Sequence, residues 1–253
     1  MGDNILTMIK VIELPIDKDM GGLTSYVLQL YRMIDKKEFE LTLLSYDDPQ
    51  NFDVNYKVET VSRPYHIIQF YKKMKFLLSE GKDIIHFHQS YVNIIPILIA
   101  KLAGFKTIIL HAHSSSIDDN RKFVRFLKTG LHKVGRFLLP YLVDTYIGCS
   151  TKASEWMFPR KCIDSDSYYL LHNAIDLDLY DRNINLGLEI RQKFNIPKNA
   201  LIVGHIGRFT PVKNHPFIID IFKEVLKQNP KALEAVWDFA YDKVGYLGTN
   251  TPI

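Results

Sequence analysis

The sequence predicts an α/β protein built on a parallel, doubly wound β-sheet. Seven short runs are almost continuously apolar, as expected of strands that are covered on both faces. Helical patterns separate these runs, and such alternation is typical of parallel sheets. The expected strands span residues 6–14, 39–45, 82–88, 105–113, 143–149, 167–172 and 200–207.

Two of the intervening helices have the clearest periodicity. In residues 21–35 and again in residues 215–230, apolar side chains recur at helical spacing. Pro216 lies in the first turn of the second helix, where a backbone N–H has no partner within the helix, so the missing N–H of proline costs no hydrogen bond. Both helices follow an expected strand directly, as a βαβ arrangement requires.

A polar stretch over residues 174–199 divides the chain. It contains Pro197 and a single short helical pattern, and a new strand begins at Ala200, followed by a glycine turn and a helix. A second Rossmann-like unit would open in this way. After Lys231 no clear strand period is visible. We therefore predict a first Rossmann-like domain over residues 1–175, a linker over 176–199, and the first strand and helix of a second, incomplete domain over 200–253.

Composition and charge narrow the class of protein. The 253 residues suffice for a sizeable core, and the net charge of +4 permits an anionic partner without requiring one. We expect no nucleic-acid partner.

Cys149 and Cys162 have no metal-type spacing and are too few for a secreted disulfide framework. Neither a signal peptide nor a membrane span is visible, so we expect a cytoplasmic protein.

Gly21 and Gly22 lie between the first strand and the first helix. Two glycines allow a close backbone approach to a ligand, and the helix that follows offers free N–H groups to an anion. The alternative is a plain strand-to-helix turn.

Arg208 and Lys213 follow Gly207 at the carboxyl end of the last expected strand. Ligands of open α/β sheets bind at this edge, and the two cations are suited to a diphosphate. The alternative is a pair of solvated surface cations.

Histidines occur in two similar pairs at the ends of two strands, His86 with His88 and His111 with His113. Alternation places each pair on one face of its strand, and we expect these side chains at the rim rather than in the core. His86 is the one that best suits a purely structural role. Together the four could also form a metal site, although the only carboxylates with plausible spacing are Asp118 and Asp119.

Ser114 to Ser116 follow His113 and offer hydroxyls and backbone N–H groups to a sugar or phosphate. They could equally form the N-cap of the next helix.

Residues 121–139 form a basic amphipathic segment that contains no acid. It could lie on an anionic membrane surface, or pack its apolar stripe on the sheet and leave its cations in water. Gly130 and Gly135 should loosen this helix.

Four stretches in order resemble the group 1 (family 4) glycosyltransferases of the GT-B fold. "MGGLTSYVLQLYRMID" is similar to the first glycine loop and helix of that family, and "LHAHSSS" to its acceptor-side histidine segment. "CSTKASEWMF" and then "LHNAIDLDLY" are similar to its passage at the domain junction, with Ala174 in place of a glycine. "GHIGRFTPVKNHPFIIDIFKEVLKQNP" is similar to the opening of its donor domain.

The resemblance implies transfer of a sugar from a nucleotide-diphosphate sugar to an acceptor hydroxyl, with retention at the anomeric carbon. Arg208 and Lys213 would stabilise the leaving diphosphate, with Gly21 and Gly22 approaching it from the first domain. His113, or failing that His111, would be catalytic beside the transferred sugar. His88, Ser114 and Ser115 would contact sugar or acceptor. No metal or other cofactor is implied.

The resemblance also implies partners and a setting. We expect a saccharide or lipid-linked acceptor, a role in cell-envelope or capsule polysaccharide synthesis, and contact of residues 121–139 with the inner face of the plasma membrane. Members of the family continue for about another domain's length, so we expect a truncated donor domain. Two other hypotheses are a non-catalytic remnant that binds an acceptor or partner, and a metal-dependent hydrolase that uses the four histidines.

Overall fold

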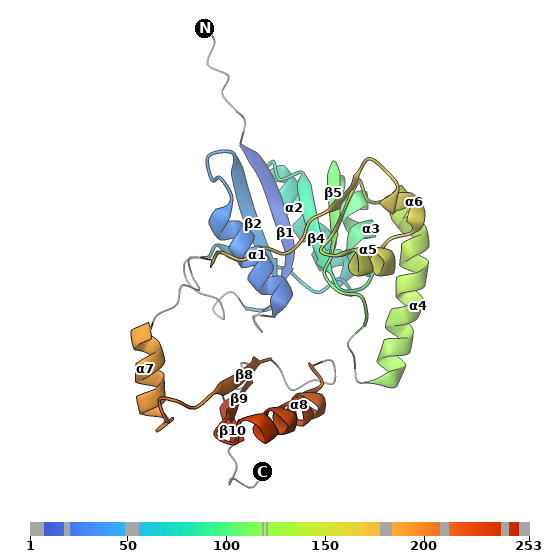
Figure 1. The fold of residues 1–253 in the computed structure, drawn as a ribbon. Helices are drawn as coiled ribbons and strands as arrows, with labels where there is room; N and C mark the ends of the chain where they lie inside the picture. Colours follow the sequence, from blue (N-terminus) through green and yellow to red (C-terminus); the bar gives the residue numbers. More distant parts are fainter. Residues whose placement is uncertain are drawn as a thin grey trace. The chain divides into compact units, whose positions relative to one another are not determined.

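The computed structural model describes residues 8–17, 21–48, 56–117, 119, 121–177, 184–207, 213–238 and 243–247. The chain forms two compact units, Met1–Ile175 and Asp176–Ile253. The first unit contains a seven-stranded sheet with helices on both faces (Figure 1).

The sheet of the first unit is parallel throughout, with the strand order β3-β2-β1-β4-β5-β6-β7. The chain winds outward in one direction from β1 and in the other direction from β4. The carboxyl ends of β1 and β4 therefore flank the topological switch point, where ligands bind in open α/β sheets. The strands are β1 Ile9–Ile16, β2 Phe39–Ser45, β3 Val58–Thr60, β4 Ile84–Gln89, β5 Thr107–Ala112, β6 Thr145–Gly148 and β7 Tyr168–Leu170.

Helices cover the two faces of this sheet with different cores. The larger core joins Ile12 of β1 to Phe70 of α2 and Ile97 of α3. The smaller core joins Leu43 of β2 to Val27 of α1. The helices are α1 Gly22–Met33, α2 Ile67–Ser79, α3 Ile94–Ala103, α4 Lys122–Leu138, the 3₁₀ turn η2 Leu139–Tyr141, α5 Thr151–Met157 and α6 Arg160–Ile163.

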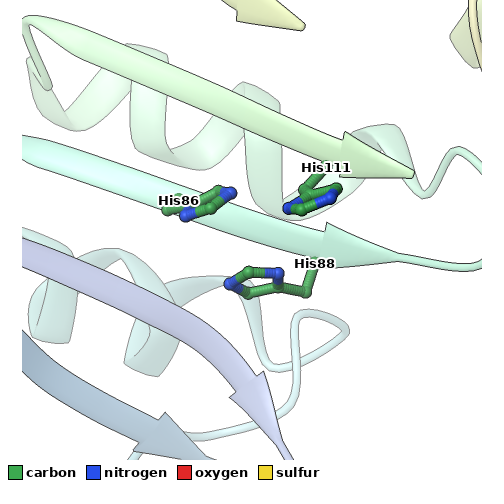
Figure 2. Close-up of side chains that lie close together, drawn as sticks. All are labelled: His86, His88 and His111. Carbon is green, nitrogen blue, oxygen red and sulfur yellow. The ribbon is translucent and has the colours of Figure 1, made fainter. Parts of the chain in front are cut away.

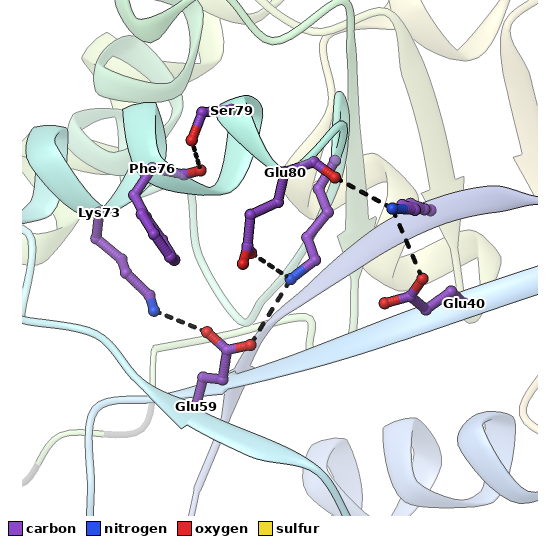
Figure 3. Close-up of polar contacts among 8 residues, drawn as sticks. Glu40, Glu59, Lys73, Phe76, Ser79 and Glu80 are labelled. Carbon is purple, nitrogen blue, oxygen red and sulfur yellow. Dashed lines mark hydrogen bonds and ion pairs between the residues drawn. The ribbon is translucent and has the colours of Figure 1, made fainter.

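The edge strand β3 is only three residues long and was not expected from the sequence, because it is too short to show a period. Ion pairs fix it to the rest of the unit. Glu59 of β3 lies 2.7 Å from the Nζ of Lys73 on α2 and 3.7 Å from the Nζ of the buried Lys82 (Figure 3). Burial raises the pKa of the Glu59 carboxyl, but the hydrogen bond and charge of Lys73 outweigh burial and hold it below its usual range.

The second unit contains a three-stranded sheet in the order β10-β9-β8. β8 (Ile202–Ile206) pairs in parallel with β9 (Leu233–Asp238), and β9 pairs antiparallel with β10 (Lys243–Leu247). The helices α7 (Ile184–Lys193) and α8 (His215–Gln228) complete it.

The prediction of a single strand in this unit was wrong. β9 and β10 lie in the tail, where the sequence shows no clear period. Strand pairing uses backbone hydrogen bonds, which any residue but proline supplies, so a short strand of mixed composition can form without a hydrophobic alternation.

Candidate functional site

Histidines and one glutamate meet on the α1 side of the sheet, next to the switch point. Glu13 of β1 is directly opposite His86 of β4, and His88 of β4 is opposite His111 of β5. Because successive side chains alternate between faces, these four lie on one face while their apolar neighbours enter the larger core. The strands therefore gather polar groups at a single place.

The cluster is connected by hydrogen bonds through the carboxylate of Glu13. Its Oε2 lies 2.6 Å from Nε2 of His88 and 3.0 Å from Nδ1 of His86. The Nδ1 of His88 lies 2.9 Å from Nε2 of His113. Figure 2 shows the rings of His86, His88 and His111 close together, with His86 and His111 in nearly parallel planes.

The expectation that all four histidines lie at the rim was wrong. The exposed fraction is 6% for His86, 1% for His88 and 0% for His111, whereas His113 is half-buried. Tyr26 of α1 explains the burial, because its ring centre lies 5.1 Å from those of both His111 and His113. A strand end can be a core position when a helix that follows another strand of the sheet covers it, as α1 does here for β5.

Burial and mutual contact set the charges of the cluster. Burial alone raises the pKa of Glu13, but the charges and hydrogen bonds of His86 and His88 outweigh it and hold that pKa well below its usual range. Burial lowers the pKa of His88 to about 4 and that of His113 to about 2, and it also lowers the pKa of His111. At neutral pH the cluster therefore combines an ionised Glu13 carboxylate with neutral rings at His88, His111 and His113.

Glu13 is the residue that the sequence analysis missed. The carboxylates considered there were Asp118, which lies outside the described residues, and Asp119, which pairs with Arg121 and Lys128 instead. The sequence does contain a signal that could have identified it: Glu13 is a lone acid within an apolar strand. A buried acid requires hydrogen-bonding or charged partners, so such a position indicates a polar cluster.

A metal ion could be held by His86, His88 and His111. One nitrogen from each lies within 4.8 Å of the others. The Nε2 of His86 and both ring nitrogens of His111 have no hydrogen-bond partner in the part of the chain that the structure describes. Both nitrogens of His88 are already engaged, so ligation by His88 would break one of its two hydrogen bonds.

The glycine turn after β1 leaves open space. Gly21 is the N-cap of α1, and a Cβ added to Gly22 would meet no atom within 4 Å. Gly21 has a φ of −72°, and Gly22 has no positive φ either, so neither position requires glycine for its backbone conformation. Thr24 fixes the turn from within the helix, with its Oγ1 accepting a bond from the backbone N–H of Asp17 at 2.9 Å.

The serines after β5 form a small turn of their own. The Oγ of Ser114 donates to the carbonyl of Ser116 at 3.0 Å, and Ser115 is exposed. They immediately follow His113, whose backbone N–H bonds to the carbonyl of Gln89 at 3.0 Å.

The predicted diphosphate cations belong to the second unit. Arg208 lies outside the described residues. Lys213 is exposed, and its side chain packs beside Gly207, where an added Cβ would lie 3.4 Å from Cδ and Cε of the lysine. Gly207 thus lets the lysine pass close to the backbone at the end of β8.

A small pocket adjoins the cluster within the first unit. It has a volume of about 160 Å³, and Tyr26 forms one wall of it. Its other lining residues are mostly apolar and come from α1 and from the segment after β7: Gln29, Leu30, Met33, Leu171, His172 and Ala174. A second pocket, of about 250 Å³, lies beside Met8 and Phe39, where β1 and β2 begin.

The helix α4 presents apolar side chains outward. Phe123, Phe126 and Phe137 are each more than 70% exposed, and Leu127 and Val134 more than 50%. Leu131 and Leu138 of the same stripe are partly buried against the larger core, so part of the stripe packs on the first unit while the three phenylalanines are exposed.

The opposite face of α4 carries the packing contacts. His132 stacks on Trp156 at 4.2 Å, and Gly135 lies against Val92 so closely that an added Cβ would be 2.4 Å from its Cγ1. Gly135 therefore serves close packing and does not loosen the helix, contrary to the sequence expectation. Arg136 donates to the carbonyls of Glu155, Trp156 and Phe158.

Within the described residues, every helix is too short or too polar to cross a bilayer. A family model described as Glycosyltransferase Family 4 matches residues 20–179, which include Gly21 and Gly22, all four histidines and the pocket beside Tyr26. The chain belongs to Glycosyltransferase Family 4.

Curated relatives of this Family 4 chain include two glycosyltransferases. The chain is 25% identical over 223 residues to EpsF of Bacillus subtilis, a protein assigned as a glycosyltransferase, covering 84% of this chain and 57% of EpsF. It is 21% identical over 233 residues to the UDP-Gal:alpha-D-GlcNAc-diphosphoundecaprenol alpha-1,3-galactosyltransferase of Escherichia coli, covering 87% of this chain and 59% of that enzyme. The chain thus spans less than two thirds of the length of these relatives.

Another curated relative, which is not a glycosyltransferase, matches only a short part of the chain. An anaerobic ribonucleoside-triphosphate reductase of Haemophilus influenzae is 34% identical over 101 residues, which are 40% of this chain and 14% of the reductase. A match of this extent does not assign the Family 4 chain to the reductases.

Among solved structures, the fold of the Family 4 chain is similar to that of a glycosyltransferase from Rickettsia africae. The TM-score is 0.60 at 12% identity, over 93% of this chain and 69% of that one. This confirms the α/β, GT-B-like fold expected from the sequence.

Proposed function

We propose that this chain provides the acceptor-side part of a retaining glycosyltransferase, which moves a hexose from a nucleotide-diphosphate sugar to a polysaccharide or lipid-linked acceptor. The observation that carries the proposal is the position of the histidine cluster. The cluster lies at the switch point of the sheet, and its four histidines fall within the segment that matches the family model.

In the proposed reaction each predicted group has one role. His113, with His111 behind it, lies beside the transferred sugar, and Ser114 follows at the same edge of the sheet. Gly21 and Gly22 give the diphosphate access to the N-terminus of α1. Arg208 and Lys213 neutralise the charge that develops on the leaving diphosphate, so no metal is part of this mechanism.

A lipid-linked acceptor is favoured by two observations. The Escherichia coli relative is named for an acceptor carried on diphosphoundecaprenol. The pocket beside Tyr26 is lined mainly by apolar groups, which suit the apolar part of an acceptor better than its sugar. Synthesis of a cell-envelope or capsule polysaccharide is the setting that fits such an acceptor.

The outward face of α4 supports docking on the inner, anionic face of the plasma membrane. Apolar side chains there are exposed together, and the helix carries no acid. Lys122, Arg125 and Lys133 are exposed and make no ion pair with any described residue, so they are available to lipid phosphates.

The proposal is tested by titrating the purified chain with UDP-galactose and following binding and transfer to octyl α-D-GlcNAc diphosphate. We expect binding that weakens at least tenfold in Lys213→Ala, because a charge-assisted contact to phosphate is lost. Lys198→Ala removes an exposed lysine from the same unit and serves as the control. Binding of the acceptor without transfer would support the non-catalytic alternative, and failure to bind either probe would contradict the proposal.

A further inference from the structure

The chain of hydrogen bonds from Glu13 through His88 to His113 determines where the protons of the cluster lie. An ionised carboxylate can only accept hydrogen bonds. Glu13 Oε2 contacts both Nδ1 of His86 and Nε2 of His88, so both of these nitrogens carry a hydrogen and donate.

The proton position of His88 then fixes that of His113. A neutral imidazole carries one N–H. Since His88 uses its hydrogen at Nε2, its Nδ1 is an acceptor, and Nε2 of His113 at 2.9 Å must be the donor. The low pKa values of His88 and His113, about 4 and about 2, agree with both rings being neutral at pH 7.

The ring nitrogen of His113 that remains is Nδ1, with its lone pair. The hydrogen bond that joins the His113 ring to a described residue is made through Nε2, and Nδ1 makes none of its own there. His113 is the half-buried member of the cluster, beyond the end of β5, and Tyr26 and His88 pack on its ring at 5.1 Å. The lone pair is thus held on a ring whose orientation is fixed by its neighbours.

We propose that Glu13 and His88 are positioning residues that hold His113 in the Nε2–H tautomer, so that its Nδ1 accepts a hydrogen bond from a sugar hydroxyl. This rests on the proposed function only for the identity of the hydroxyl. A half-buried nitrogen that can only accept favours ligands that place a donor, such as a hydroxyl, at that position, because a ligand without a donor would leave the acceptor unpaired when it displaces water.

The tautomer can be measured without any ligand, by ¹⁵N–¹H NMR of the full chain labelled at histidine. His113→Gln assigns the His113 signals by their loss. We expect a protonated, pyrrole-type Nε2 and an unprotonated, pyridine-type Nδ1 for His113 at pH 7. A protonated Nδ1 in the unaltered protein would overturn the proposal, whatever the chain does with sugars.

Glu13→Leu tests the role of the carboxylate. It removes the acceptor that fixes His88, so we expect the His113 signals to move toward the average of the two tautomers. Thr42→Val, which replaces a buried polar group on β2, should leave them unchanged and controls for general loosening of the sheet. An unmoved His113 tautomer in folded Glu13→Leu would contradict the proposal.

Two further measurements separate the alternatives. Adding UDP-galactose or octyl α-D-GlcNAc diphosphate in turn shows whether a donor or an acceptor hydroxyl shifts the Nδ1 signal, and a shift with neither would contradict recognition of a hydroxyl. Stoichiometric zinc bound through His88 would also contradict the proposal, because Nδ1 or Nε2 of His88 would then be a metal ligand.

Discussion

Nε2 of His88 lies 2.6 Å from Oε2 of Glu13, although 75 positions separate the two residues in the sequence. Both side chains are almost completely buried. A buried carboxylate remains ionised only when strong donors surround it, and here two imidazoles supply them. The pair therefore links the stability of the sheet to the protonation of its histidines.

As the pH is lowered, the first unit should begin to lose stability at a higher pH than that at which ordinary carboxylates become protonated. The pKa of His88 falls from 6.5 to about 4, and those of His111 and His113 are also lowered. Between these values the unfolded chain binds more protons than the folded one, so stability present above pH 6.5 is lost as the pH falls toward 4. Each such histidine contributes a slope of about 1.4 kcal/mol per pH unit in this window.

Urea denaturation between pH 8 and pH 4.5 measures this slope. His113→Gln should reduce the slope of the free energy of unfolding against pH by about the contribution of one histidine. His66→Gln, which alters an exposed histidine before α2, should leave it unchanged. A free energy of unfolding that stays constant from pH 7 to pH 5 would contradict this prediction.

The two glycines of α4 should respond oppositely to alanine. At Gly135 the new Cβ would lie 2.4 Å from Val92 Cγ1, so we expect a loss of about 1–3 kcal/mol of stability. At Gly130 no atom lies within 4 Å, so the gain in helix propensity, about 0.5–1 kcal/mol, should appear alone. Thermal unfolding of the two variants compares them directly, and equal shifts would show that Val92 does not restrict α4.

Arg136 should be structural, unlike the exposed Lys133 on the same helix. Its guanidinium donates to three carbonyls at 2.6–3.0 Å at the end of α5. Arg136→Met should lower the free energy of unfolding by about 2 kcal/mol, because the carbonyls lose a charged donor. Lys133→Met, at an exposed position on the same helix, should change it by no more than about 0.5 kcal/mol. Chemical denaturation distinguishes these outcomes.

Membrane binding should depend on the exposed apolar face of α4. Replacing Phe126 and Phe137 with serine should weaken binding to phosphatidylserine vesicles by at least about tenfold, because each phenylalanine contributes about 1.5–3 kcal/mol when buried. Phe76→Ser removes an exposed phenylalanine from α2 and should have no such effect. Vesicle sedimentation at low and high salt measures the binding, which should weaken with salt. Equal binding by all three proteins would contradict docking through α4.

The sequence by itself determined the α/β class, the parallel sheet of the first unit and the fact that the two members of each histidine pair share one face of their strand. These features follow from local periods, because side chains alternate along a strand and recur every 3.6 residues along a helix. The family could also be recognised from short segments, since the glycine turn and the histidine run are each continuous in the chain.

Only the tertiary structure decided which residues meet. Glu13 became the partner of His86 and His88 because β1 lies beside β4 in the sheet, and no local pattern encodes that strand order. The sequence also could not predict that Phe126 and Phe137 are exposed. An amphipathic pattern shows that a helix has an apolar face, but it does not show whether that face packs against the rest of the protein. Contacts between distant segments are set by the packing of the whole sheet, and the sequence of either segment alone does not contain them.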